Sequence, residues 1–211
     1  MENYLENYKM ALSSAHENLD EINKKRDYYK EKLEKIEEDD KQEDQLFLSY
    51  VILAGIADDV EEVLNLLSKE SKPRYQNFII RNITEHVIEY MYLMEHKELI
   101  PEYFGSEAEL DVEESADMNN ISKAYKNFGQ NRYASKRASV NSMAKAIGEK
   151  YATDGVPGLY DVFSIISENC HNSYLYAVID EMSESETQNK MFNLGLMLLV
   201  LKKLLEFEKG N

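Results

Sequence analysis

A heptad repeat runs through the first part of the chain, from about residue 3 to residue 38. Its two seam positions alternate at steps of three and four residues, as a coiled-coil seam requires. One seam position holds Leu5, Leu12, Leu19, Arg26 and Leu33, and the other holds Tyr8, Ala15, Ile22, Tyr29 and Ile36. We therefore predict a long helix within residues 1–40. It is either an arm that binds a second copy or a partner protein, or a helix packed along the rest of the fold.

Helical periodicity continues beyond this segment, and residues that break helices are rare. The 211 residues include only three prolines and eight glycines, and 43% of them are hydrophobic. Apolar residues recur every three or four positions in about 43–69, 74–97 and 159–182, and in a last segment that ends near residue 207. That last segment is almost entirely apolar from Met191 to Leu205, which predicts burial. The predicted fold class is all-α: a long coiled-coil-like helix, a helical bundle and an apolar C-terminal helix.

Charge and cysteine content limit the classes of partner and compartment. The formal net charge is −16, which disfavours general binding to DNA and to anionic membranes. Cys170 is the only cysteine, which fits a reducing cytosol. The first residues lack a basic region followed by an apolar run, and the most apolar runs, Leu46–Ala57 and Leu194–Leu201, fall short of the ~20 residues that span a bilayer. We therefore expect a cytoplasmic protein that does not enter a membrane.

One segment reverses the charge of the chain. Residues 116–152 contain seven Lys or Arg against two Asp or Glu, a local charge of +5, with aromatic residues between them. Basic side chains with aromatic ones are what an RNA-binding surface uses, as phosphate contacts and stacking. The candidate RNA-binding residues are Lys123, Lys126, Arg132, Lys136 and Arg137. The alternative is that this segment pairs with the acidic part of the first helix, in the same chain or in a partner.

The hexamer Arg81-Asn82-Ile83-Thr84-Glu85-His86 carries the main candidate site. On a helix, Arg81 and His86 are about 140° apart around the axis, so one helix could not close both on one phosphate, but two facing helices could. A histidine exchanges protons at neutral pH and could serve as general base or acid in RNA cleavage. Arg81 would hold the phosphate and stabilise its added negative charge, and Asn82 could orient the phosphate or the partner histidine.

A purely structural interpretation of the same hexamer is available. Arg81 and Glu85 are four residues apart and could form a helix ion pair. His86 could be a buried histidine with its hydrogen bonds satisfied. In that case the protein would be a non-catalytic helical module that binds a partner protein. That module would have Arg81 sealed by Glu85 and its largest apolar patch on the seam of residues 5–36.

A second cluster of reactive groups lies in the segment that begins at about residue 159. Ser167 and His171 are four residues apart, so a hydrogen bond between them is expected to be within reach. Glu168-x-x-His171 has the spacing of half of a di-iron motif, but the chain has no second copy, so we predict no metal. The sequence has no Walker loop, dinucleotide glycine pattern, CxxC pair or HExxH motif, and we predict no cofactor.

The hexamer resembles the Arg-(Asn/His/Asp)-x-x-x-His signature of HEPN proteins, and a weaker resemblance extends from about Leu46 to Ala177. It implies a HEPN-like helical domain in residues 43–211. It also implies a metal-independent endoribonuclease of the toxin or phage-defence type, a homodimer with Arg81 and His86 from both subunits in the site.

RNA and an antitoxin or another defence-system protein would be its partners. The resemblance also places Tyr160, Ser167 and His171 in one pocket with Arg81 and Glu85. That pocket is an alternative site, which could instead bind a nucleotide-like small molecule.

Overall fold

The computed structural model describes residues 2–36, 42–69, 73–101, 103, 138–150, 158–172 and 186–210. Within these ranges the chain forms six α-helices, one short 3-10 helix and no strand, so the predicted all-α class is confirmed. The elements are α1 (Glu2–Leu33), α2 (Glu43–Ser68), α3 (Pro73–Glu95), η1 (Lys97–Leu99), α6 (Val140–Lys150), α7 (Leu159–His171) and α9 (Glu186–Gly210).

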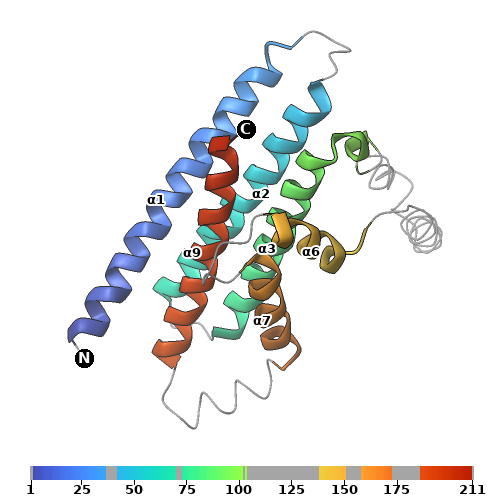
Figure 1. Ribbon diagram of the computed structural model, residues 1–211. Helices are drawn as coiled ribbons and strands as arrows, with labels where there is room; N and C mark the ends of the chain where they lie inside the picture. Colours follow the sequence, from blue (N-terminus) through green and yellow to red (C-terminus); the bar gives the residue numbers. More distant parts are fainter. Residues whose placement is uncertain are drawn as a thin grey trace, which may run out of the picture.

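Four of the long helices enclose the core. Helix α1 packs on α2, α2 on α3, α3 on α9, and α9 on α1, while the shorter α6 and α7 pack on α3. In Figure 1, α1 and α9 run in the same direction and α2 runs in the opposite one. Helix α3 contacts α2, α6, α7 and α9, and it buries Ile80, Ile83, Val87, Ile88, Tyr90 and Met91. The hexamer of residues 81–86 therefore lies on the helix with the most neighbours.

The heptad seam of α1 faces the rest of the molecule. Ala15 and Ile22 are fully buried. Tyr8, Leu12, Leu19 and Tyr29 are partly buried against the same core, whereas Leu5, at the start, is 55% exposed. Of the two interpretations of the heptad, the structure shows the helix packed along the fold. The expectation of a large exposed apolar patch on residues 5–36 is therefore wrong for most of the seam.

Two helices end earlier than the periodicity predicts. Helix α1 ends at Leu33 rather than near residue 38, because the next residues lead into an acidic run that is unfavourable at a helix C-terminus. Helix α7 ends at His171, where the Asn172 N–H donates to the Glu168 carbonyl at 3.0 Å. The remainder of the helix predicted to reach residue 182 lies outside the described residues, as does most of the turn at 153–158.

Local sequence explains where the site-bearing helices begin. Helix α3 begins at Pro73, whose missing N–H costs nothing in a first helical turn. The first turn of α7 is held by the Asp161 carboxylate, which accepts the Gly158 N–H at 3.0 Å. Helix α6 begins after Ser139, whose Oγ accepts the Ser142 N–H at 3.2 Å. These caps set where α6 and α7 begin.

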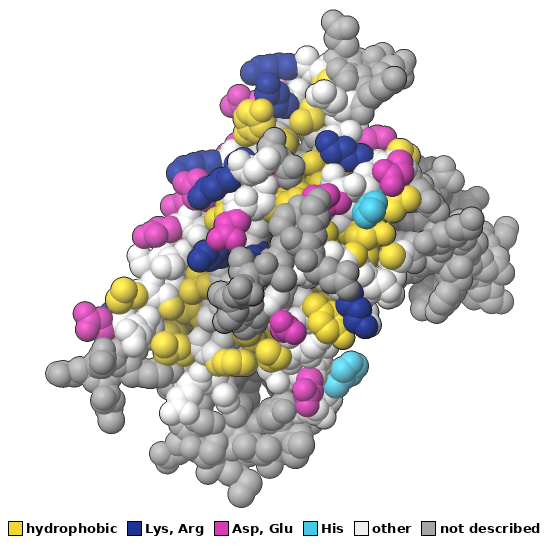
Figure 2. Space-filling model, in the orientation of Figure 1, with side chains coloured by type: hydrophobic (Ala, Val, Ile, Leu, Met, Phe, Trp, Pro, Cys, Tyr) yellow, Lys and Arg dark blue, Asp and Glu magenta, His cyan; other side chains and the backbone are white. Residues whose placement is uncertain are grey.

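The surface over α1 and α9 carries both signs of charge. Figure 2 shows basic and acidic side chains interspersed there, with hydrophobic side chains between them. A surface hollow of about 410 Å³ between the two helices is lined by Glu17, Asn18, Asp20, Glu21, Lys24, Lys25, Leu205 and Lys209. Mixed charge of this kind does not favour a polyanion. None of the described helices has the length and apolar character needed to cross a membrane.

Candidate functional site

The residues of the hexamer project from two sides of α3. Arg81 points toward α7, where its guanidinium carbon lies 5.9 Å from the centre of the Phe163 ring. Asn82 points toward α2, where its Nδ2 donates to Asp59 Oδ2 at 2.7 Å. His86 follows Asn82 by four residues and therefore lies on the same side as Asn82. Within one chain, the structure thus separates Arg81 from His86.

The hydrogen bond of His86 fixes which ring nitrogen carries the proton. Nδ1 lies 3.0 Å from the main-chain oxygen of Asn82. Because a carbonyl oxygen only accepts, Nδ1 must donate, and in the neutral ring Nε2 keeps its lone pair. Nε2 has no partner among the described residues, and the side chain is half-buried. Nε2 is therefore the ring nitrogen of His86 that can accept a proton.

Among the described residues, no side chain covers the glycine of α2 that lies level with His86. Helices α2 and α3 pack antiparallel, with Asp59 of α2 against Asn82 of α3. Gly55 lies four residues before Asp59 and His86 lies four residues after Asn82, so Gly55 is level with His86. Gly55 is exposed, and a Cβ added there would meet no atom within 4 Å. The described part of the chain therefore leaves this point of α2 open beside His86.

Arg81 is held in place but not sealed. Its Nη2 lies 2.8 Å from Glu85 Oε1, and the two side chains are 35% and 28% exposed. The structural interpretation predicts this ion pair, and the pair is present. It also predicts that Glu85 seals Arg81 from solvent, and Arg81 is not sealed. The Nε atom is buried and has no hydrogen-bond partner among the described residues. The guanidinium thus keeps one donor that no described residue uses.

One face of α7 carries Tyr160 and Ser167, two of the residues that the resemblance singles out. Tyr160, Phe163, Ser167 and Cys170 recur at helical spacing, and Phe163 lies under Arg81. Burial raises the pKa of the Cys170 thiol, with the Arg81 charge opposing and the Glu85 charge reinforcing that shift. Both charged groups are therefore near this face. Cys170 is buried as a neutral thiol, which suits packing better than nucleophilic attack.

Ser167 and His171 do not form the hydrogen bond that their four-residue spacing allows. Ser167 Oγ is buried and has no partner among the described residues. His171 is exposed in the last turn of α7, beside Cys170. The two residues are a little over one turn apart, and their side chains point to different surroundings. The structure thus brings Ser167 to the α3 side of α7 and leaves His171 at the surface, while Tyr160 lies 5.3 Å below the ammonium group of Lys145.

The other predicted contacts fall partly outside the described ranges. Lys123, Lys126, Arg132, Lys136 and Arg137 lie outside them, so the RNA-binding segment stays a prediction. Asp58 and Glu62 are exposed on α2, and Glu89 is half-buried on α3. Across the described part of the chain, no group of three or more His, Cys, Asp or Glu side chains could hold a metal ion.

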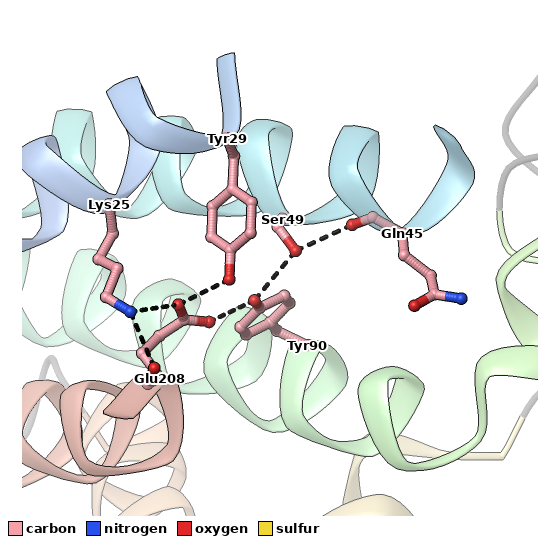
Figure 3. Close-up of polar contacts among 6 residues, drawn as sticks. All are labelled: Lys25, Tyr29, Gln45, Ser49, Tyr90 and Glu208. Carbon is pink, nitrogen blue, oxygen red and sulfur yellow. Dashed lines mark hydrogen bonds and ion pairs between the residues drawn. The ribbon is translucent and has the colours of Figure 1, made fainter. Parts of the chain in front are cut away.

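A second polar cluster, which the sequence did not predict, lies inside the four-helix core (Figure 3). Glu208 of α9 is only 2% exposed. Its Oε2 accepts a hydrogen bond from the Tyr29 hydroxyl of α1 at 2.9 Å, and its Oε1 accepts one from the Tyr90 hydroxyl of α3. The Tyr90 oxygen also lies 3.1 Å from Ser49 Oγ of α2, which donates to the Gln45 carbonyl at 2.9 Å.

Lys25 completes the cluster from α1. Its Nζ donates to the main-chain oxygen of Glu208 at 2.8 Å and lies 3.5 Å from the Glu208 carboxylate. That carbonyl belongs to the last turn of α9, where carbonyl groups lack partners within the helix. The cation also offsets the unfavourable position of a carboxylate at a helix C-terminus.

Both tyrosines of the cluster stay neutral. Burial, and after it the charge of Glu208, raise the pKa of the Tyr29 and Tyr90 phenols. Neutral hydroxyls can donate to the carboxylate, so the two acceptor oxygens and the two donors match. The cluster is thus a satisfied polar network that ties together all four helices around the core, and it has the character of a structural element.

Comparison of the chain with protein-family models, with curated proteins and with solved structures gave no match.

Proposed function

We propose that this protein is a metal-independent endoribonuclease of the toxin or phage-defence type, and that two copies complete its active site. The observation that carries the proposal is the fixed proton on His86 Nδ1, which leaves Nε2 as a base beside an open surface. The resemblance of residues 81–86 to the HEPN signature supports the same activity.

In the proposed reaction, His86 Nε2 takes the proton from a 2′-hydroxyl of RNA. The 2′-oxygen attacks the adjacent phosphorus, and the 5′-oxygen leaves and takes up a proton from solvent. The products are a 2′,3′-cyclic phosphate and a 5′-hydroxyl. Arg81 holds the phosphate and stabilises its additional negative charge through charge-assisted hydrogen bonds. For this, Arg81 must exchange Glu85 for the phosphate.

The positions of these side chains support a site made by two copies. Arg81 faces α7 and His86 faces α2, so a phosphate held by the one is out of reach of the other in the same chain. A two-fold axis that sets α3 against α3 of the second copy brings Arg81 of one chain to His86 of the other. Asn82 would support the site through its main-chain oxygen, which holds His86, rather than by a contact of its amide with the phosphate.

Exposed apolar side chains on α2 and α3 support this contact surface. Val51 is 41% exposed and Phe78 is 48% exposed. Because α2 and α3 run antiparallel, Val51 and Phe78 lie on opposite sides of the Asn82–Asp59 contact. A self-complementary interface built around α3 would cover both side chains and enclose the hexamer.

The proposal is tested by RNA cleavage in EDTA, with wild type compared with Arg81→Ala and His86→Ala. We expect each substitution to lower the rate at least about a hundredfold. Arg26→Ala is the matched control for Arg81, because Arg26 also pairs with a carboxylate at 2.8 Å and its side chain is 30% exposed. His16→Ala, on the exposed face of α1, is the control for His86. A wild-type protein that is folded and leaves several RNAs uncut would contradict the proposal, and loss of cleavage in His171→Ala alone would move the site.

Self-association provides a separate prediction. We expect Phe78→Ser to weaken dimerisation by about tenfold or more, because Phe78 would be a buried aromatic contact of the interface. Phe192→Ser is the matched control, since Phe192 is 50% exposed but lies on α9. Sedimentation equilibrium measures both dissociation constants. Equal dissociation constants for the two variants would exclude the α2–α3 surface as the interface.

A further inference from the structure

Buried polar atoms without a partner among the described residues occur on both α3 and α7, two helices that pack on each other. Arg81 Nε, Asn77 Oδ1 and Ser167 Oγ are all buried, and none has a hydrogen-bond partner among the described residues. Asn77 precedes Arg81 by one helical turn on α3, and Ser167 lies on the α7 face that contacts Arg81 through Phe163. A buried donor or acceptor without a partner is destabilising, so such groups call for a ligand or another function.

We infer that a phosphate group binds between α3 and α7, held by Arg81 and Ser167. Arg81 offers its Nε–H, Ser167 offers its O–H, and rotation of the Asn77 amide by half a turn replaces the acceptor by an NH₂ donor. A tetrahedral phosphate has more acceptor oxygens than a planar carboxylate, and they point in different directions, so it can accept from the guanidinium, the serine and the amide together. The Phe163 ring under the guanidinium holds its plane in position.

This site assigns Ser167 a role as a phosphate-binding residue. Where the bound phosphate is that of RNA, this site rests on the proposed function, because Arg81 belongs both to this site and to the proposed active site. It also defines a role for Glu85. That carboxylate occupies Arg81 Nη2 at 2.8 Å and repels an incoming anion, while it keeps the guanidinium in place. Glu85 therefore lowers the affinity of the site for phosphate, whereas Ser167 raises it.

The test is calorimetric titration with inorganic phosphate and, separately, with AMP, at constant ionic strength and without RNA. We expect the wild type to bind phosphate, Ser167→Ala to bind it about tenfold more weakly, and Arg81→Ala not to bind it measurably. Glu85→Gln should bind it more tightly, by roughly threefold, because the repelling charge is lost. The AMP titration distinguishes a site for a nucleotide phosphate, which binds AMP at least as well, from a site for the free ion.

Ser164→Ala is the matched control on the same helix. Ser164 is exposed, and its Oγ donates to the Tyr160 carbonyl at 2.8 Å, so its loss should leave phosphate binding unchanged. Equal affinities of Ser164→Ala and Ser167→Ala, weaker binding by Glu85→Gln, or no binding by the wild type would overturn the inference. Cleavage of RNA by a protein that binds no phosphate here would leave the proposed function standing without this site. Phosphate binding by a protein that does not cleave RNA would retain the site and remove the nuclease.

Discussion

When Arg81→Ala and His86→Ala chains are co-expressed, we expect RNA cleavage to return to about one quarter of the wild-type rate, although each variant alone is nearly inactive. Random association makes half of the dimers mixed. In a mixed dimer, one of the two sites combines the intact Arg81 of one chain with the intact His86 of the other. The reason is geometric, because the two side chains project toward α7 and toward α2 from the same helix.

The control for this experiment is co-expression of Arg81→Ala with the double variant Arg81→Ala/His86→Ala. It contains no intact pair in any dimer and should stay inactive. Tags of two kinds allow the mixed dimers to be purified, and their rate should then be about half that of wild type. A mixture no more active than its parents would show that the two residues do not act across a dimer interface.

Glu208→Ala is expected to lower the free energy of unfolding by about 3 kcal/mol. The substitution removes the acceptor of two hydroxyl groups, those of Tyr29 and Tyr90, and Tyr90 is completely buried. Lys25 loses its carboxylate as well, but its side chain is 35% exposed and can turn to solvent, which limits the loss. Urea unfolding at one fixed protein concentration measures the change, because the proposed dimerisation would make stability depend on concentration.

Glu206→Ala is the matched control, because Glu206 lies on the same helix, two residues before Glu208. Its carboxylate is 52% exposed and its contacts with Lys202 and Lys203 are 3.9 and 4.0 Å, so its loss should change stability by less than about 0.5 kcal/mol. Similar unfolding midpoints for the two variants would show that the network around Glu208 contributes little to stability.

Periodicity was sufficient to predict the fold class, but it did not say where each apolar face is buried. The repeat through Ala15 and Ile22 fits a dimer arm and a packed helix equally well, because both need the same spacing. Only the presence of α2 and α9 against that seam distinguishes them. The end of α7 was missed because residues beyond His171 continue the apolar pattern, whereas the backbone caps the helix at Asn172.

The candidate site was predictable only in part, since spacing along one helix does not identify partners on another. The Arg81–Glu85 pair follows from the four-residue step, and the structure contains it. The bond between Asn82 and Asp59 joins residues 23 positions apart and leaves no local signal. The sequence does carry a signal for Glu208, because this residue continues the buried register of Leu201 and Leu204 at steps of three and four. A charged residue in an apolar register implies buried partners.

The contact between Lys25 and the end of α9 joins residues 183 positions apart. During synthesis, the surface of α1 that α9 covers stays without its partner until nearly all of these residues have been made. Contacts of such long range slow folding, because the entropy of closing a long loop is lost before the contact forms. We therefore expect assembly of the core to finish with the docking of α9, and an incomplete chain to present the buried seam of α1 to chaperones.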